Sequence, residues 1–154
     1  MTGPPAVAGR VRAPGLRVSG TPAGPGDPAT GSATAWGTSS RGWVDIPGAA
    51  TAFSPAAGSS ATFNAVYSGE TSCAGDAATW CSFRVVVVAT SGMSEFKPAA
   101  GTDFVLATAG APTANQSVQR TADGFPGGAG YTIKAQVTVV GAGTPWTTGT
   151  SPSR

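Results

Sequence analysis

The chain has 154 residues, only 10% of them are charged, and its formal net charge at pH 7 is +2. This length suits one domain of ordinary size. The 23 glycines and 13 prolines leave little room for long helices, because both residue types are unfavourable in helix interiors. The absence of histidine excludes Ser-His-Asp and Cys-His nucleophile activation and removes the commonest metal ligand.

The distribution of charge argues against nucleic acid as a partner. Residues 1–42 carry four arginines and one aspartate, whereas residues 43–154 carry five basic and six acidic side chains. A nucleic-acid-binding domain needs a clustered basic face, and the larger segment is nearly neutral. No window approaches the roughly 18 to 20 apolar residues that span a bilayer, so we expect no membrane insertion.

The first 41 residues are rich in Pro, Gly, Ala, Ser and Thr and contain few large apolar side chains. Such a segment buries too little apolar surface to offset the entropy of ordering it. We therefore predict a disordered tail over residues 1–41, a folded domain over 42–145 and a flexible tail over 146–154. The C-terminal end offers no clear last strand, so either a sheet edge stays exposed or the N-terminal segment fills the gap.

From residue 43 onward, short apolar and polar alternations indicate half-buried strands. They cover residues 43–46, 52–54, 61–67, 81–88, 93–96, 103–108, 114–121 and, most clearly, 131–139. Turn signals such as Pro47-Gly48 separate them. We predict an all-β fold, a single antiparallel β-sandwich of immunoglobulin-like or jelly-roll-like type. The expected core residues are Trp43, Phe63, Tyr67, Phe83, Val85, Val87, Phe104, Leu106, Tyr131, Ile133, Val137 and Val139.

The two cysteines, Cys73 and Cys81, flank a Gly-Asp turn and lead into the run Val85–Val88. Their spacing differs from the C-x-x-C of redox pairs, and two thiolates are too few for a four-cysteine zinc site. A structural disulfide is the preferred interpretation, with a redox pair or two buried thiols as alternatives. A disulfide favours a secreted or cell-surface location, although residues 1–18 lack the apolar core of a secretory signal.

The candidate ligand residues are Trp80, Glu70 and Asp76, all close to the cysteine loop. Trp80 could stack against a sugar ring, but most tryptophans are highly buried, and a core position is the alternative. Glu70 and Asp76 could form the carboxylate pair of a glycosidase, or they are solvated loop residues. The acids are spread along the chain: Asp27, Asp45, Glu70, Asp76, Glu95, Asp103 and Asp123. We assign no catalytic residue, metal site or cofactor.

Several segments carry a resemblance to a known group of sequences. They are TSC at 71–73, WCSFR at 80–84, KPAAGTDF at 97–104 and SVQR at 117–120. Over about residues 42–140, the chain resembles uncharacterised actinobacterial exported proteins with an S-x-C…W-C-S-x-R, P-x-x-G-x-D-F and S-x-x-R progression. That group continues into a further strand with aromatic and acidic residues, where this chain has PWTTGTSPSR. The resemblance implies a β-sandwich and export, and no established activity.

These features favour a non-enzymatic extracellular module, structural or ligand-binding, with loops at one end that contact a glycan or a cell-surface protein. One alternative is a structural subunit of a surface, fibre or capsid-decorating assembly that associates through strand edges. A carboxylate-based hydrolase is a third hypothesis.

Overall fold

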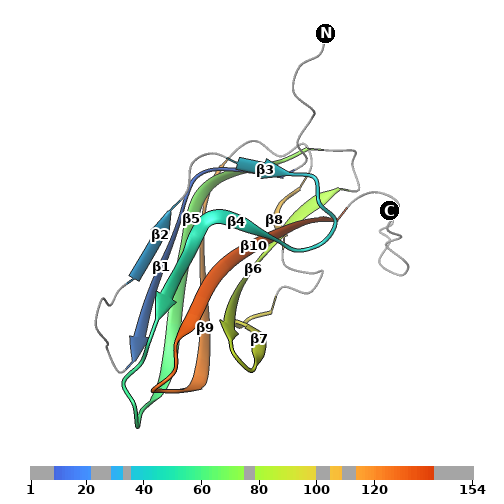
Figure 1. Cartoon of the computed structure of the whole chain (residues 1–154). Helices are drawn as coiled ribbons and strands as arrows, with labels where there is room; N and C mark the ends of the chain where they lie inside the picture. Colours follow the sequence, from blue (N-terminus) through green and yellow to red (C-terminus); the bar gives the residue numbers. More distant parts are fainter. Residues whose placement is uncertain are drawn as a thin grey trace.

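The computed structural model describes residues 9–21, 29–32, 36–74, 79–99, 105–108 and 114–140. These residues form ten strands (Figure 1): β1 (Gly9–Thr21), β2 (Ala29–Ser32), β3 (Trp36–Thr38), β4 (Val44–Phe53), β5 (Ser60–Cys73), β6 (Trp80–Ala89), β7 (Gly92–Glu95), β8 (Val105–Thr108), β9 (Ala114–Pro126) and β10 (Tyr131–Val140). Across these ranges there is no helix with the length and hydropathy needed to cross a membrane.

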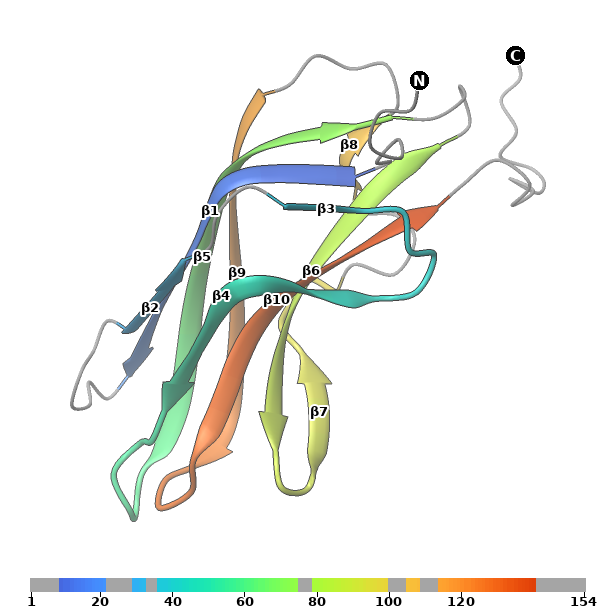
Figure 2. The same cartoon turned by 45° about the horizontal axis from the view of Figure 1, so that its top comes forward.

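The strands form two antiparallel sheets that face each other (Figures 1 and 2). Sheet A has the order β2-β1-β5-β9, with β3 also paired to β1. Sheet B has the order β4-β10-β6-β7, with β8 also paired to β6. Every pair between named strands is antiparallel. The predicted all-β antiparallel sandwich is confirmed.

Part of the N-terminal segment, for which composition predicts a tail over 1–41, forms strands of the sandwich in the residues that the structure describes. β1 pairs with β5 on one side and with β2 and β3 on the other. Leu16 and Val18 of β1 are fully buried in the core. A segment with few large apolar residues can still form such a strand, because a strand needs apolar side chains on one face only. The neighbouring strands supply most of the apolar surface. The N-terminal segment thus fills a place in sheet A.

The inward-facing side chains of the two sheets form one main hydrophobic core. The predicted residues found buried are Phe63, Tyr67, Phe83, Val85, Val87, Tyr131, Ile133, Val137 and Val139. Trp43 is only partly buried, and its ring packs against the Arg84 guanidinium, whose carbon lies 4.5 Å from the ring centre. Phe104 and the side chain of Leu106 lie outside the described residues, as do residues 141–154.

An aromatic cluster fills one end of this core around the fully buried Phe63. The Phe63 ring centroid lies 5.1 Å from Phe53, 5.3 Å from Phe125 and 5.7 Å from Tyr131. These separations are typical of favourable aromatic pairs. Gly20 of β1 lies opposite Phe63, and a Cβ on Gly20 would lie 2.6 Å from the Phe53 ring. The Phe53 ring therefore occupies the space that a side chain at Gly20 would need.

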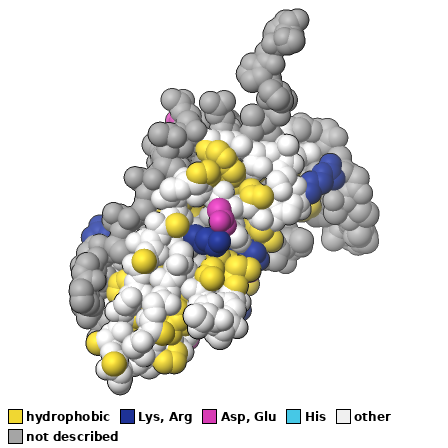
Figure 3. Space-filling view, viewed as in Figure 1, with side chains coloured by type: hydrophobic (Ala, Val, Ile, Leu, Met, Phe, Trp, Pro, Cys, Tyr) yellow, Lys and Arg dark blue, Asp and Glu magenta, His cyan; other side chains and the backbone are white. Residues whose placement is uncertain are grey.

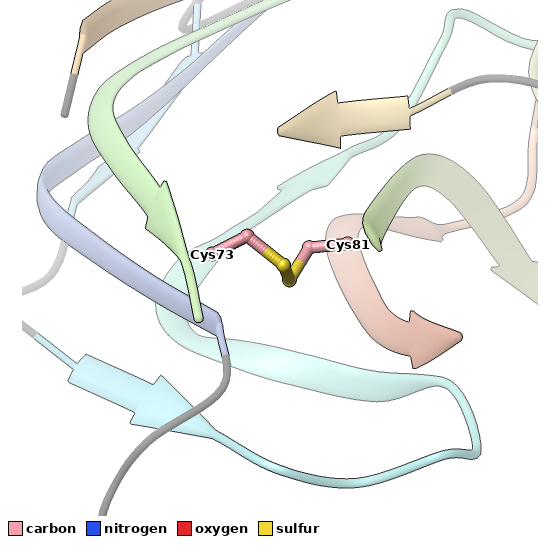
Figure 4. The surroundings of a disulfide bond; sticks show 2 residues. All are labelled: Cys73 and Cys81. Atoms are coloured by element: carbon pink, nitrogen blue, oxygen red, sulfur yellow. A yellow bond between two sulfur atoms is a disulfide. The ribbon is translucent and has the colours of Figure 1, made fainter. Parts of the chain in front are cut away.

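The disulfide between Cys73 and Cys81 joins the two sheets (Figure 4). Cys73 is the last residue of β5 in sheet A, and Cys81 lies at the start of β6 in sheet B, with 5.9 Å between their Cα atoms. The predicted bridge is confirmed. Both cysteines are buried beside Val139. Because the bond is buried, a reductant reaches it only when the structure opens locally.

Gly20→Ala tests whether the N-terminal strand packs into the core. The added methyl group would lie 2.6 and 2.8 Å from two carbons of the Phe53 ring. We expect the free energy of unfolding, measured by urea titration, to fall by roughly 1–3 kcal/mol.

Gly15→Ala, in the same strand, is the matched control, because the nearest atom to its Cβ is Ser68 Oγ at 4.0 Å. We expect a change of less than about 1 kcal/mol there. Equal effects of the two substitutions would contradict the place of β1 in the core.

Candidate functional site

The structure separates the candidate ligand residues of the cysteine loop. Trp80 begins β6 and is only 8% exposed, so it offers no open stacking face. Its neighbour Cys81 points into the core, which puts Trp80 on the outer side of sheet B. Glu70 lies on the outer side of sheet A, next to the buried Thr71. Asp76 lies outside the described residues. Glu70 and Trp80 therefore lie on the opposite outer faces of the sandwich.

Two loops at one end of the sandwich carry only small side chains. Residues 54–59 and 127–130 lie side by side, and the backbone N–H of Gly127 donates to the carbonyl of Ser59 at 2.7 Å. These loops consist of Ser, Pro, Ala and Gly. They contribute no charged or aromatic group to a ligand site.

A better candidate lies where an edge of sheet B meets an edge of sheet A, between β7 and β9. Immediately after Glu95, the N–H of the fully buried Phe96 donates to the carbonyl of Val85 in sheet B at 2.8 Å. The next residue, Lys97, pairs with Thr121 of β9 through two backbone hydrogen bonds of 2.7 and 3.0 Å. The chain thus crosses between sheets within two residues and ties their edges together.

A groove of about 350 Å³ opens beside this tie, and we name it the seam groove. It is lined by Thr62, Ser94, Glu95, Lys97, Thr121, Ala122, Asp123 and Phe125. The lining residues carry hydroxyl groups, two carboxylates, one ammonium group and one phenyl ring. The volume lies at the lower end of the range for small-ligand sites, about 300–1,000 Å³.

Glu95 also ends a row of polar side chains across the outer face of sheet B. Its Oε1 lies 3.7 Å from Arg84 Nη1. Arg84 Nε donates to Gln136 Oε1, and Gln136 Nε2 donates to Asp45 Oδ1, both at 2.8 Å. The row runs from β7 through β6 and β10 to β4. On the face shown in Figure 3, acidic and basic side chains meet near the centre, and hydrophobic side chains form small separate groups.

Arg120 approaches Glu95 from sheet A. It lies opposite Ala65, whose side chain is in the core, so Arg120 is on the inner side of edge strand β9. Burial lowers the pKa of Arg120, and the charge of Glu95 acts in the opposite direction. An inward-pointing charge on an edge strand disfavours pairing with another chain. The same arginine thus protects the β9 edge and places positive charge near the groove.

Sequence reasoning missed the seam groove. Glu95 and Asp123 stand among the acids spread along the chain and Lys97 in the KPAAGTDF segment, and no sequence pattern brings the three together. The residues meet because of the long-range pairing of Lys97 with Thr121. Within the described ranges, no three His, Cys, Asp or Glu side chains are grouped to hold a metal ion.

No family model matches the chain, and searches of curated proteins and of solved structures also found no match. Function is therefore inferred from the seam groove, the polar row and the disulfide themselves.

Asp45→Asn tests the polar row through its pH dependence. Burial raises the pKa of Asp45, but hydrogen bonds from Gln136 and Lys134 and the charge of Lys134 outweigh it, so the pKa is lowered. At pH values above about 3.9, the pKa of an aspartate in the unfolded chain, the charged Asp45 carboxylate therefore stabilises the fold. This stabilisation is lost as the pH falls through the lower pKa that Asp45 has in the folded state.

Because the Asp45 side chain is 52% exposed, we expect the substitution to lower the free energy of unfolding at pH 7 by less than about 1 kcal/mol. Urea titrations of wild type and Asp45→Asn should converge once the pH lies below the folded pKa. If the free energies of unfolding of wild type and Asp45→Asn differed by the same amount at neutral and at strongly acidic pH, the stabilising role of the charged Asp45 carboxylate would be contradicted.

Proposed function

We propose that this protein is a non-enzymatic β-sandwich module that functions outside the reducing cytosol and binds a ligand in the seam groove. The observation that carries the binding role is the groove itself, which is lined by polar residues of both sheets and by Phe125. The location is supported by the disulfide, which is buried between the sheets and is typical of oxidising compartments.

Binding is favoured over catalysis because the Glu95 carboxylate already forms an ion pair with Arg84. Its carboxylate lies 3.7 Å from Arg84 and within the electrostatic influence of Arg120. A glycosidase needs two carboxyl groups that both face the substrate, and the Glu95 carboxylate is instead paired with Arg84. The sequence also lacks histidine, the side chain most often used for proton transfer.

The β9 edge argues against assembly by strand pairing along the seam. The backbone N–H and carbonyl groups of Thr121 on that edge are already hydrogen-bonded to the backbone of Lys97. Arg120 points inward from the same strand, a device that disfavours edge-to-edge association. A structural subunit that assembles through this edge is therefore the weaker hypothesis.

Filling the groove should abolish binding. Ser94 is exposed on β7 and lines the groove, so the indole ring of Ser94→Trp would compete with a ligand for that space. Wild type and Ser94→Trp are compared on one array of neutral polysaccharides, acidic polysaccharides and peptides. We expect wild type to bind at least one class and Ser94→Trp to bind about tenfold more weakly or not at all.

Ser68→Trp is the matched control, because Ser68 is an exposed serine of β5 that does not line the groove. It should bind like wild type, and mass spectrometry should show the bound ligand intact. Undiminished binding by Ser94→Trp, or no wild-type binding to any class, would contradict the proposed site. Cleavage of the ligand would contradict the non-enzymatic role.

A further inference from the structure

We infer that the ligand of the seam groove is a neutral glycan, held by the carboxylate of Asp123, the ammonium group of Lys97 and the ring of Phe125. This inference rests on the proposed function, since it names the ligand class of the same groove.

The polar groups of the groove match the hydroxyl groups of a sugar. The hydroxyls of Thr62, Ser94 and Thr121 both donate and accept hydrogen bonds. Asp123 only accepts and Lys97 only donates, and both are exposed. Neighbouring hydroxyls of a sugar ring supply both functions, so one can donate to the carboxylate while the next accepts from the ammonium group. Hydrogen bonds to charged groups are the stronger ones, which favours this pair as the anchor.

Phe125 provides a rigid apolar surface in the groove. The ring is partly buried, and its centroid lies 5.3 Å from that of Phe63 and 5.4 Å from that of Tyr131. These neighbours hold the ring in place before a ligand arrives, so binding loses little side-chain entropy. The C–H groups of a sugar ring suit such a surface, because aromatic side chains bury large apolar areas.

The charge balance of the groove favours a neutral ligand. The Glu95 carboxylate faces Arg84 at 3.7 Å, which offsets its charge. The remaining charges of the lining are one acid, Asp123, and one base, Lys97, since Arg120 points inward from β9 and is not among the lining residues. An acidic glycan would place its carboxylates near Asp123, and this repulsion would weaken binding.

A glycan is favoured over a protein partner by the surface around the groove. Protein interfaces depend on large buried anchors, mostly aromatic side chains and arginine. Met93 is the one exposed large hydrophobic residue in the described part of the chain. The groove, at about 350 Å³, is also small. A peptide is therefore the alternative to be tested and not the expected ligand.

The test is a ¹⁵N-HSQC titration of the oxidised full chain with three probes. They are neutral hexasaccharides (β-1,4-glucan, β-1,3-glucan and β-1,4-linked N-acetylglucosamine), an oligogalacturonate and a peptide pool. We expect at least one neutral hexasaccharide to shift the amides of Lys97 and of residues 121–125. Asp123→Ala should weaken that binding about tenfold. Asp45→Ala, which removes an exposed carboxylate on another face, should leave it unchanged.

The possible failures are distinguishable. If no neutral hexasaccharide shifts these amides at about 10 mM, the inference is wrong. If the oligogalacturonate or a peptide shifts them instead, the glycan assignment fails but the groove remains a binding site. Shifts confined to other surfaces, or equal effects of Asp123→Ala and Asp45→Ala, also overturn the inference. Loss of both the amide shifts and the Ser94→Trp effect on the array would overturn the proposed function as well.

Discussion

The Cys73–Cys81 bond fixes how the two sheets face each other. It joins β5, which pairs with β1 and β9, to β6, which pairs with β10, β7 and β8. Side chains alternate along a strand, so placing both cysteines between the sheets determines which residues of β5 and β6 point inward. Tyr67 and Phe83 then meet in the core, with ring centroids 4.5 Å apart. A shift of one residue in either strand would turn its core face outward.

The groove lies where two edge strands of unequal length meet. β7 has 4 residues and β9 has 13, so the sheet edges match over a short stretch only. Phe96 and Lys97 close that stretch through backbone bonds to Val85 and Thr121. Beside it, the outer polar side chains of β9 lie close to the aromatic end of the core at Phe125. The arrangement thus presents polar and apolar groups together, on a frame that the disulfide and the aromatic cluster hold fixed.

The alternation of apolar and polar residues along the sequence predicted the strands in which that alternation is regular. Residues 131–139 alternate with period two, and Tyr131, Ile133 and Val137 are buried as expected. The cysteine spacing likewise indicated a bridge, which is present. β1 was missed because its inward residues include Gly20, and the reason for that glycine is the Phe53 ring of another sheet. The seam groove was missed for a similar reason, since the pairing of Lys97 with Thr121 joins segments that no local pattern connects.

The central claim is that the covalent bond between Cys73 and Cys81 holds the two sheets together. Urea unfolding of the purified chain, before and after reduction, tests it most directly. Loop-closure entropy for a sequence separation of 8 predicts that reduction lowers the free energy of unfolding by about 2–3 kcal/mol. An unchanged unfolding midpoint after reduction would contradict the claim.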